Sequence, residues 1–296
     1  MTAPPLLAVP NVSEGRDRAS VDAIAMAFTA DGAARLLDVH ADVDHHRAVL
    51  SLAGEPGTLA QALAHGAAEA VRRIDLADGR RGQHPHVGAV DVVPVVYFNE
   101  GLRGAACAEA LVAAHTIGSE VGVPVLLYGE LAAGRTRAQL RRGGARALAE
   151  RLRGGELRPD FGPRAPRAAA GVTLVAARAP LVAFNLELAP PAGLREAAAI
   201  AAAVREGGAE GLPGLRAIGV ALRRGDELVG QVSMNVERPA ELPLASVVAA
   251  VERHARVARA ELVGLAPRVA LEGFPAELPM PGFDPARHVI ENALGL

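Results

Sequence analysis

The residues most suited to chemistry stand just before a β-branched segment at residues 90–98. They read Gly82-Gln83-His84-Pro85-His86-Val87-Gly88-Ala89-Val90-Asp91. Pro85 fixes its own φ and favours an extended backbone at His84, so the imidazole is held rigidly at the start of a predicted strand. Because the pKa of histidine lies near neutral pH, His84 is a candidate for proton transfer. Two ordinary loop histidines would give the same pattern, so a His-Pro pair alone is a weak signal.

A second polar segment stands between two short apolar runs at residues 36–40 and 48–53. It reads His40-Ala41-Asp42-Val43-Asp44-His45-His46-Arg47. Imidazole and carboxylate groups suit zinc or iron, so these side chains, together with His84 and His86, suggest a metal site. Neither His-Pro-His nor His-His is a specific ligand spacing, and a solvated loop has the same composition. We therefore expect no metal.

The elements that must position these segments follow the order β-α-β-β-α-β in the first half of the chain, with one further helix and strand. The stretch from Gly134 to Pro166 is rich in Arg, Gly and Pro, and we interpret it as a connector that covers a site and contains one short helix at 146–152. The predicted strands are 6–9, 36–40, 48–53, 90–98 and 123–128, and the helices begin at Ser13 or Asp17, at Thr58 and at Leu102.

The second half repeats much of this order without repeating the sequence. We expect strands at 172–176 and 181–188, a helix at 194–206, a hairpin of 217–222 with 228–235, a long helix at 244–262 and a closing helix at 289–294. The pattern predicts an α/β fold, an α+β sandwich of two ferredoxin-like βαββαβ lobes. A cleft between two such lobes is where a small molecule would bind.

Composition excludes several classes of protein. The chain has 296 residues, half of them hydrophobic, and a net charge of −2, so no global field attracts nucleic acid or an anionic membrane. Cys107 is the only cysteine, which rules out an internal disulfide. No apolar run reaches membrane-spanning length, and no signal peptide is recognisable, so we expect a cytoplasmic protein. Walker, dinucleotide-binding and Gly-x-Ser-x-Gly motifs are absent from the sequence.

Several segments, in order along the chain, together resemble the glutamate formimidoyltransferase family. Each match is modest, but the set spans nearly the whole sequence. The matching segments are Val9-Pro10-Asn11-Val12-Ser13-Glu14-Gly15, Leu36–Val39, His84-Pro85-His86-Val87-Gly88-Ala89-Val90-Asp91, Pro124–Glu130, Pro159-Asp160-Phe161-Gly162-Pro163, Ala183-Phe184-Asn185, Ala217-Ile218-Gly219, Gln231-Val232-Ser233-Met234-Asn235, Leu262–Leu265 and Phe283-Asp284-Pro285.

The resemblance implies two formiminotransferase subdomains, an N-terminal one at 1–178 and a C-terminal one at 179–296, without a cyclodeaminase domain. It also implies the reaction: a formimino group moves from N-formimino-L-glutamate to N5 of tetrahydrofolate, a step of histidine degradation. Tetrahydrofolate would be the co-substrate. A homodimer that acts on small molecules, without metal, nucleic acid or membrane, is the implied assembly.

The resemblance also assigns residues. The acid–base histidine of the family falls on His84, and a loop arginine falls on Arg47, which could bind a substrate carboxylate. The family often has Asp where this chain has His40, so Asp42 or Asp44 could supply that negative charge. Its folate stretch falls on 162–171, where a Ser-Trp-Gly is replaced by Ala169-Ala170-Gly171. The expected substrate- and folate-binding residues are Asn11, Arg47, Gly162, Pro163, Arg164, Arg167 and Gly171.

Three other functions stay open at this point. The first is a related folate-dependent enzyme with a formyl donor, which the change at His40 would favour. The second is a non-catalytic folate-binding paralogue. The third is a metal-dependent hydrolase built on His40, His45, His46, His84 and His86.

Overall fold

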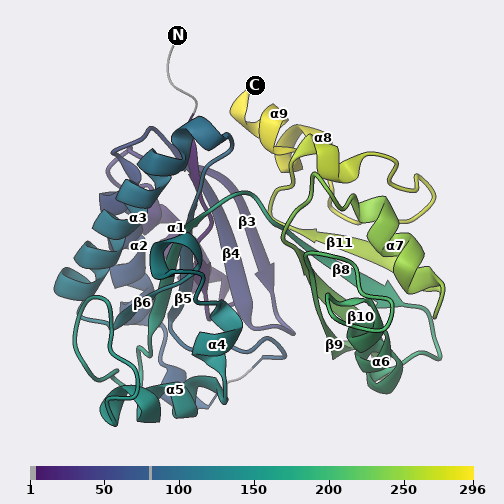
Figure 1. Cartoon of the computed structure of the whole chain (residues 1–296), viewed down its shortest axis with the longest axis horizontal. Coiled ribbons are helices and arrows are strands. Elements are labelled where there is room, and N and C mark those ends of the chain that lie inside the picture. Colours follow the sequence, from purple (N-terminus) through teal and green to yellow (C-terminus); the bar gives the residue numbers. More distant parts are fainter. Residues whose placement is uncertain (1–4, 80–81) are drawn as a thin grey trace. The chain divides into compact units, whose positions relative to one another are not determined.

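The computed structural model describes residues 5–79 and 82–296, and the chain divides into two compact units, Met1–Ala179 and Pro180–Leu296. Each unit mixes helices with a β-sheet, so the predicted α/β class is confirmed (Figure 1). The ferredoxin-like description and the ligand cleft stay predictions. Within the part of the chain that is described, no helix is long and apolar enough to cross a membrane.

The first unit is built on a mixed sheet. β1 and β2 both lie between β4 and β5, so the strand order is β3-β4-β1/β2-β5-β7-β6. The β5–β7 and β6–β7 pairs are parallel and the other pairs are antiparallel. The strands are β1 (Leu6–Ala8), β2 (Asn11–Val12), β3 (Arg35–Asp42), β4 (Arg47–Gly54), β5 (Val90–Val96), β6 (Val125–Leu127) and β7 (Thr173–Arg178).

Helices pack on both faces of this sheet. On one face, α1 (Arg18–Phe28), α2 (Leu59–Arg73) and α3 (Arg103–Thr116) form an alanine-rich core with the strands. Small residues permit the close approach: a Cβ on Gly66 would lie 2.1 Å from the ring of Phe28. On the opposite face, α4 (Arg137–Arg141) and α5 (Gly144–Arg153) pack over β5, β6 and β7. Polar side chains of β2, β3 and β4 share that second face.

The second unit has the element order β-α-β-β-α-β followed by two short helices. Its sheet is antiparallel throughout, with the order β11-β8-β10-β9. Apolar side chains of β8, β10 and β11 form a core with α6 and α7, whereas Asn185 and Gln231 lie on the alternate positions. The elements are β8 (Val182–Leu188), α6 (Leu194–Val204), β9 (Leu215–Arg224), β10 (Glu227–Val236), α7 (Leu244–Glu252), β11 (Val257–Val263), α8 (Pro285–His288) and α9 (Ile290–Leu294).

The long helix predicted at 244–262 is wrong. α7 ends at Glu252, a turn follows, and β11 completes the second sheet beside β8. The register of β11 shifts between Val257 and Arg259, which interrupts the period-two alternation of a regular strand. Ala260 and Leu262 then alternate inward as strand residues do. The bulge concealed the strand, and the apolar residues on either side of the turn gave the appearance of one helix.

Three smaller predictions also need correction. The strand predicted at 36–40 is longer, because β3 continues to Asp42 and leaves a four-residue turn before β4. The connector contains two helices rather than one, separated at Gly143, whose φ is +78°. The strand predicted at 6–9 is followed after Pro10 by a second one, β2, because the proline removes only one N–H donor from the ladder.

Candidate active site

His84 lies in the loop that leads into β5, and this loop is fastened to the neighbouring strands. Gly88 and Gly171 form an isolated antiparallel bridge, and the Ser13 hydroxyl donates to the Gly88 carbonyl at 2.7 Å. Gly171 has φ +68°, and a Cβ there would lie 2.2 Å from the carbonyl oxygen of Val87, so no other residue fits without a shift. The loop backbone is therefore held in place on both sides.

Arg47, the first residue of β4, packs directly against His84. Its Nη1 lies 2.6 Å from Nδ1 and 2.5 Å from Nε2 of the imidazole. Its Nη2 donates to the side-chain oxygen of Asn11, whose Nδ2 donates in turn to the carbonyl of Val9 at 2.8 Å. Because a guanidinium has only donors, the ring nitrogen that receives its hydrogen bond must be unprotonated. The geometry therefore favours a neutral imidazole.

Asp91 joins this pair to helix α4. Its carboxylate is 1% exposed, and Oδ1 accepts a hydrogen bond from the Val87 N–H at 2.8 Å. Oδ2 forms an ion pair with Arg141 of α4 and lies 4.0 Å from Nη1 of Arg47. One carboxylate thus faces two guanidinium groups, so the surroundings of His84 carry an excess of positive charge.

These surroundings determine the protonation of both side chains. Burial, followed by the positive charges of Arg47 and Arg141, lowers the pKa of His84 well below its ordinary value. Burial, together with Arg141 and Arg137, lowers the pKa of Arg47 to about 10, with Asp91 opposing the change. At neutral pH His84 is therefore an uncharged base and Arg47 a cation. Together they can accept a proton and bind an anion.

We expect the imidazole of His84 to stay neutral down to a pH well below 6.5. Since the lowered pKa disfavours the charged form, protonation needs a more acidic solution than for a free histidine. Replacing Arg47 by Gln removes one cation and should raise this pKa towards its ordinary value. NMR titration of the His84 ring resonances in both proteins measures the change. A wild-type pKa at or above 6.5 would contradict the expectation.

Comparison with known proteins places the chain in a family. The N-terminal subdomain of the formiminotransferase domain matches residues 6–178, the part of the chain that holds His84, Arg47 and Asp91. The chain belongs to the formiminotransferase family. The glutamate formimidoyltransferase of Streptococcus pyogenes serotype M1 is 33% identical, and the match covers 97% of each chain. That of Thermoplasma acidophilum is 31% identical over 89% of this chain and 88% of its own. The mouse formimidoyltransferase-cyclodeaminase is 34% identical, and the match covers 89% of this chain but 50% of the mouse protein.

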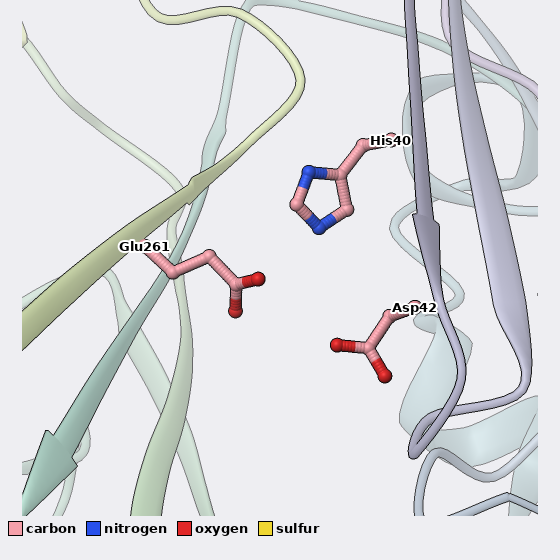
Figure 2. Close-up of side chains that lie close together, drawn as sticks. All are labelled: His40, Asp42 and Glu261. Carbon is pink, nitrogen blue, oxygen red and sulfur yellow. The ribbon is translucent and has the colours of Figure 1, made fainter. Parts of the chain in front are cut away.

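In this formiminotransferase the polar segment around His40 is part strand and part turn. His40 and Asp42 leave the same face of β3 (Figure 2). Asp42 Oδ1 accepts a hydrogen bond from the backbone N–H of His45 at 2.6 Å, which stabilises the turn. The carbonyl of Asp44 accepts from the N–H of Gln83 at 2.9 Å, and this bond connects the turn to the His84 loop.

The expected folate stretch is divided by the structure. Gly171 reaches the His84 loop through its bridge to Gly88. At the other end, Gly162 packs against Gly118, and Arg167 donates to the carbonyl of Val121 at 3.4 Å, both near the end of α3. Pro163 and Arg164 are exposed between these ends. Within the described residues, no hydrogen bond or ion pair joins this stretch to the His84 imidazole, and the folate role of the stretch stays a prediction.

The histidines of the hydrolase alternative make other contacts in the described part of the first unit. His46 Nδ1 accepts from the N–H of Gly15 at 3.2 Å and lies 3.3 Å from a Glu14 oxygen. The ring centres of His45 and His84 are 6.3 Å apart. Among residues 5–79 and 82–179, no three His, Cys, Asp or Glu side chains bring ligand atoms within 4.8 Å of one another. Glu261, also drawn in Figure 2, belongs to β11 of the second unit and accepts from Asn185 at 2.7 Å.

A pocket in the second unit differs from the His84 surroundings in its charge. Its two arginines are balanced by two carboxylates, because Glu261 also lines the pocket and Glu187 Oε2 accepts from Arg224 Nε at 3.0 Å and from Arg259 Nη2 at 2.8 Å. The pocket therefore offers paired charges rather than an excess of one sign. It is lined by Glu187, Arg224, Gln231, Arg259, Ala260, Glu261 and Pro281.

Sequence reasoning missed the contribution of helix α4. Arg137 and Arg141 are four residues apart and so share one face of this helix. The guanidinium carbon of Arg137 lies 5.8 Å from the ring centre of Tyr128, and Arg141 reaches Asp91. The available signal was an arginine pair at helical spacing shortly after the family-like segment Pro124–Glu130. The abundance of arginine in the connector concealed it.

Proposed function

We propose that the protein is a glutamate formimidoyltransferase, which moves the formimino group of N-formimino-L-glutamate to N5 of tetrahydrofolate. The observation that carries this proposal is the imidazole of His84 held against Arg47, where burial and positive charge lower its pKa, in a chain that belongs to the formiminotransferase family. The curated relatives from Streptococcus and Thermoplasma bear the same activity in their names.

The chemistry needs one base that later acts as an acid. Attack of N5 on the amidine carbon forms the new C–N bond and a tetrahedral intermediate. His84 accepts the proton that N5 loses and delivers it to the glutamate nitrogen, which leaves with the electron pair of the breaking C–N bond. A neutral imidazole can do this at physiological pH, whereas an imidazolium could not begin the cycle. Arg47 binds a carboxylate of the substrate beside the reacting atoms.

Other parts of the proposal concern the remaining residues and the setting. Tetrahydrofolate is the co-substrate, and Asp42, Asp44 or His40 stabilises the cationic amidinium. We place the N-terminal subdomain at 1–178 and the C-terminal one at 179–296. The enzyme acts in the cytoplasm as a homodimer, in histidine degradation, without metal, nucleic acid or membrane. Asn11 and the residues of the folate stretch, Gly162, Pro163, Arg164, Arg167 and Gly171, complete the proposed binding set.

The direct test is transfer by the purified protein. Formiminoglutamate and tetrahydrofolate are mixed with the enzyme, and the product is followed by absorbance after acid conversion to methenyl-tetrahydrofolate. We expect turnover that depends on both substrates and persists after dialysis against a chelator. Formylglutamate is tested in parallel, because His40 replaces an acidic residue that the family often has. Turnover with formylglutamate alone, or binding of tetrahydrofolate without turnover of either donor, would overturn the proposal.

A further inference from the structure

Three arginines lie around His84, and two of them share a single acidic partner. Arg47 and Arg141 both approach Asp91, whose carboxylate is buried. In the described part of the chain, Arg137 takes part in no ion pair. Its guanidinium group lies over the face of the Tyr128 ring. All three cations are close enough to one another for Arg137 and Arg141 to lower the pKa of Arg47. The cluster therefore has about two more positive charges than negative ones.

Buried donors in the same cluster lack partners. In residues 5–79 and 82–296, the Nε atoms of Arg47 and Arg141 and the hydroxyl of Tyr128 are buried and make no hydrogen bond. Tyr128 is only 6% exposed as a residue. An unpartnered buried polar group costs about 1–3 kcal/mol and is uncommon in native proteins, so such groups call for an explanation. A bound anion would neutralise the excess charge, and a small shift of these closed side chains would let it accept from the donors.

We infer that Tyr128, Arg137 and Arg141 form a carboxylate-binding subsite beside His84 that holds the glutamate part of the donor. This inference rests on the proposed function and extends it to the residues that select the donor. In formiminoglutamate, the nitrogen that His84 protonates is bonded to the carbon that carries the α-carboxylate, and the second carboxylate follows two methylene groups away. Arg47, in contact with His84, suits the first carboxylate, and the α4 arginines suit the second.

Folate also carries a glutamyl tail, but this tail fits the cluster less well. The pterin and aminobenzoyl groups separate it from the N5 atom that reacts, whereas the cluster begins at the imidazole itself. The subsite therefore selects a dicarboxylate donor. A donor with one carboxylate would leave part of the buried positive charge unpaired, which is unfavourable in a poorly hydrated site.

The test measures binding as well as turnover. Binding of L-glutamate, glutarate and butyrate is measured by calorimetry on the wild type and on Arg137→Gln, Arg141→Lys and Tyr128→Phe. Loss of a charged hydrogen bond at Arg137 should weaken glutamate binding about ten- to a hundredfold, and loss of the Tyr128 hydroxyl about three- to tenfold. Glutarate should bind more tightly than butyrate. The KM for formiminoglutamate should rise in parallel, while the KM for tetrahydrofolate stays unchanged.

The controls separate this inference from the proposed function. Tyr128→Phe should have the same Tm as the wild type, because the hydroxyl that it removes has no partner within the described residues. Arg146 is an exposed arginine of α5, and Arg146→Gln should change neither the Kd for glutamate nor the KM for formiminoglutamate. Glutamate binding that the variants weaken, in a protein without transfer activity, supports the subsite and overturns the function. Transfer activity with unchanged glutamate binding, no glutamate binding by the wild type, or an effect on tetrahydrofolate alone overturns the subsite.

Discussion

Replacing His84 by alanine is expected to lower the kcat of formimino transfer about a hundred- to ten-thousandfold, the usual contribution of a general acid–base group. The variant cannot accept the N5 proton or deliver one to the departing glutamate nitrogen. It should still bind glutamate, because Arg47 keeps its hydrogen bond to Asn11 and its proximity to Asp91. Steady-state kinetics of the purified variant, with both substrates saturating, measure this effect.

Two companion variants make the result specific. His84→Gln keeps a polar side chain beside Arg47 but cannot transfer a proton at neutral pH, so it should be nearly as slow as the alanine variant. His65→Ala removes a surface histidine of α2 whose side chain is 44% exposed, and its activity should equal that of the wild type. If His84→Gln retained activity within threefold of the wild type, His84 would serve only to position other groups.

Replacing Asp91 by alanine should destabilise the first unit more than any other single change to the site. The substitution leaves the partly buried guanidinium groups of Arg47 and Arg141 without Asp91, and it removes the acceptor for the Val87 N–H. Removing one partner from a buried ion pair typically costs about 3–5 kcal/mol. For a domain of this size that corresponds to a fall of roughly 6–20 °C in Tm. Thermal unfolding followed by circular dichroism or calorimetry gives the value.

The matched comparison is Asp22→Ala on helix α1. This carboxylate forms an exposed i,i+4 pair with Arg18, and such pairs contribute at most about 1 kcal/mol. Its Tm should therefore change by only a few degrees. Asp91→Asn keeps the side-chain oxygen that accepts from the Val87 N–H, and its Tm should lie between those of the two alanine variants. Equal Tm values for Asp91→Ala and Asp22→Ala would show that Asp91 does not hold the arginines in place.

A substantial part of the site could be predicted from the sequence because its signal is local. The restriction that Pro85 imposes on the residue before it and the β-branched run after it are properties of a few neighbouring residues. The hairpin of β9 and β10 was predicted for the same reason, since its two-residue turn at Gly225-Asp226 is a strong local signal. Helix α1 was also anticipated, and of the two candidate N-caps, Ser13 and Asp17, the structure uses Asp17.

Elements were missed where long-range pairing outweighed the local pattern. β11 exists because its backbone pairs with β8, about seventy residues earlier, and its bulge disguises the alternation. The connector was expected to contain one helix, but packing of Leu140 and Leu148 on the sheet stabilises two. Short apolar runs between polar residues do not reveal such partners, because the stabilising contacts come from elsewhere in the chain.

The sequence by itself determined the chemical groups, most of the order of the elements and the family resemblance. Only the tertiary structure decided which groups meet. Arg47 and His84 are 37 residues apart, and Asp91 and Arg141 are 50 apart. Their encounter depends on the order of β4, β2 and β5 in the sheet and on the docking of α4 over its second face. That arrangement partly buries the imidazole and places the charges of Arg47 and Arg141 near it, and this lowers the pKa of a histidine that the sequence shows only as a loop residue.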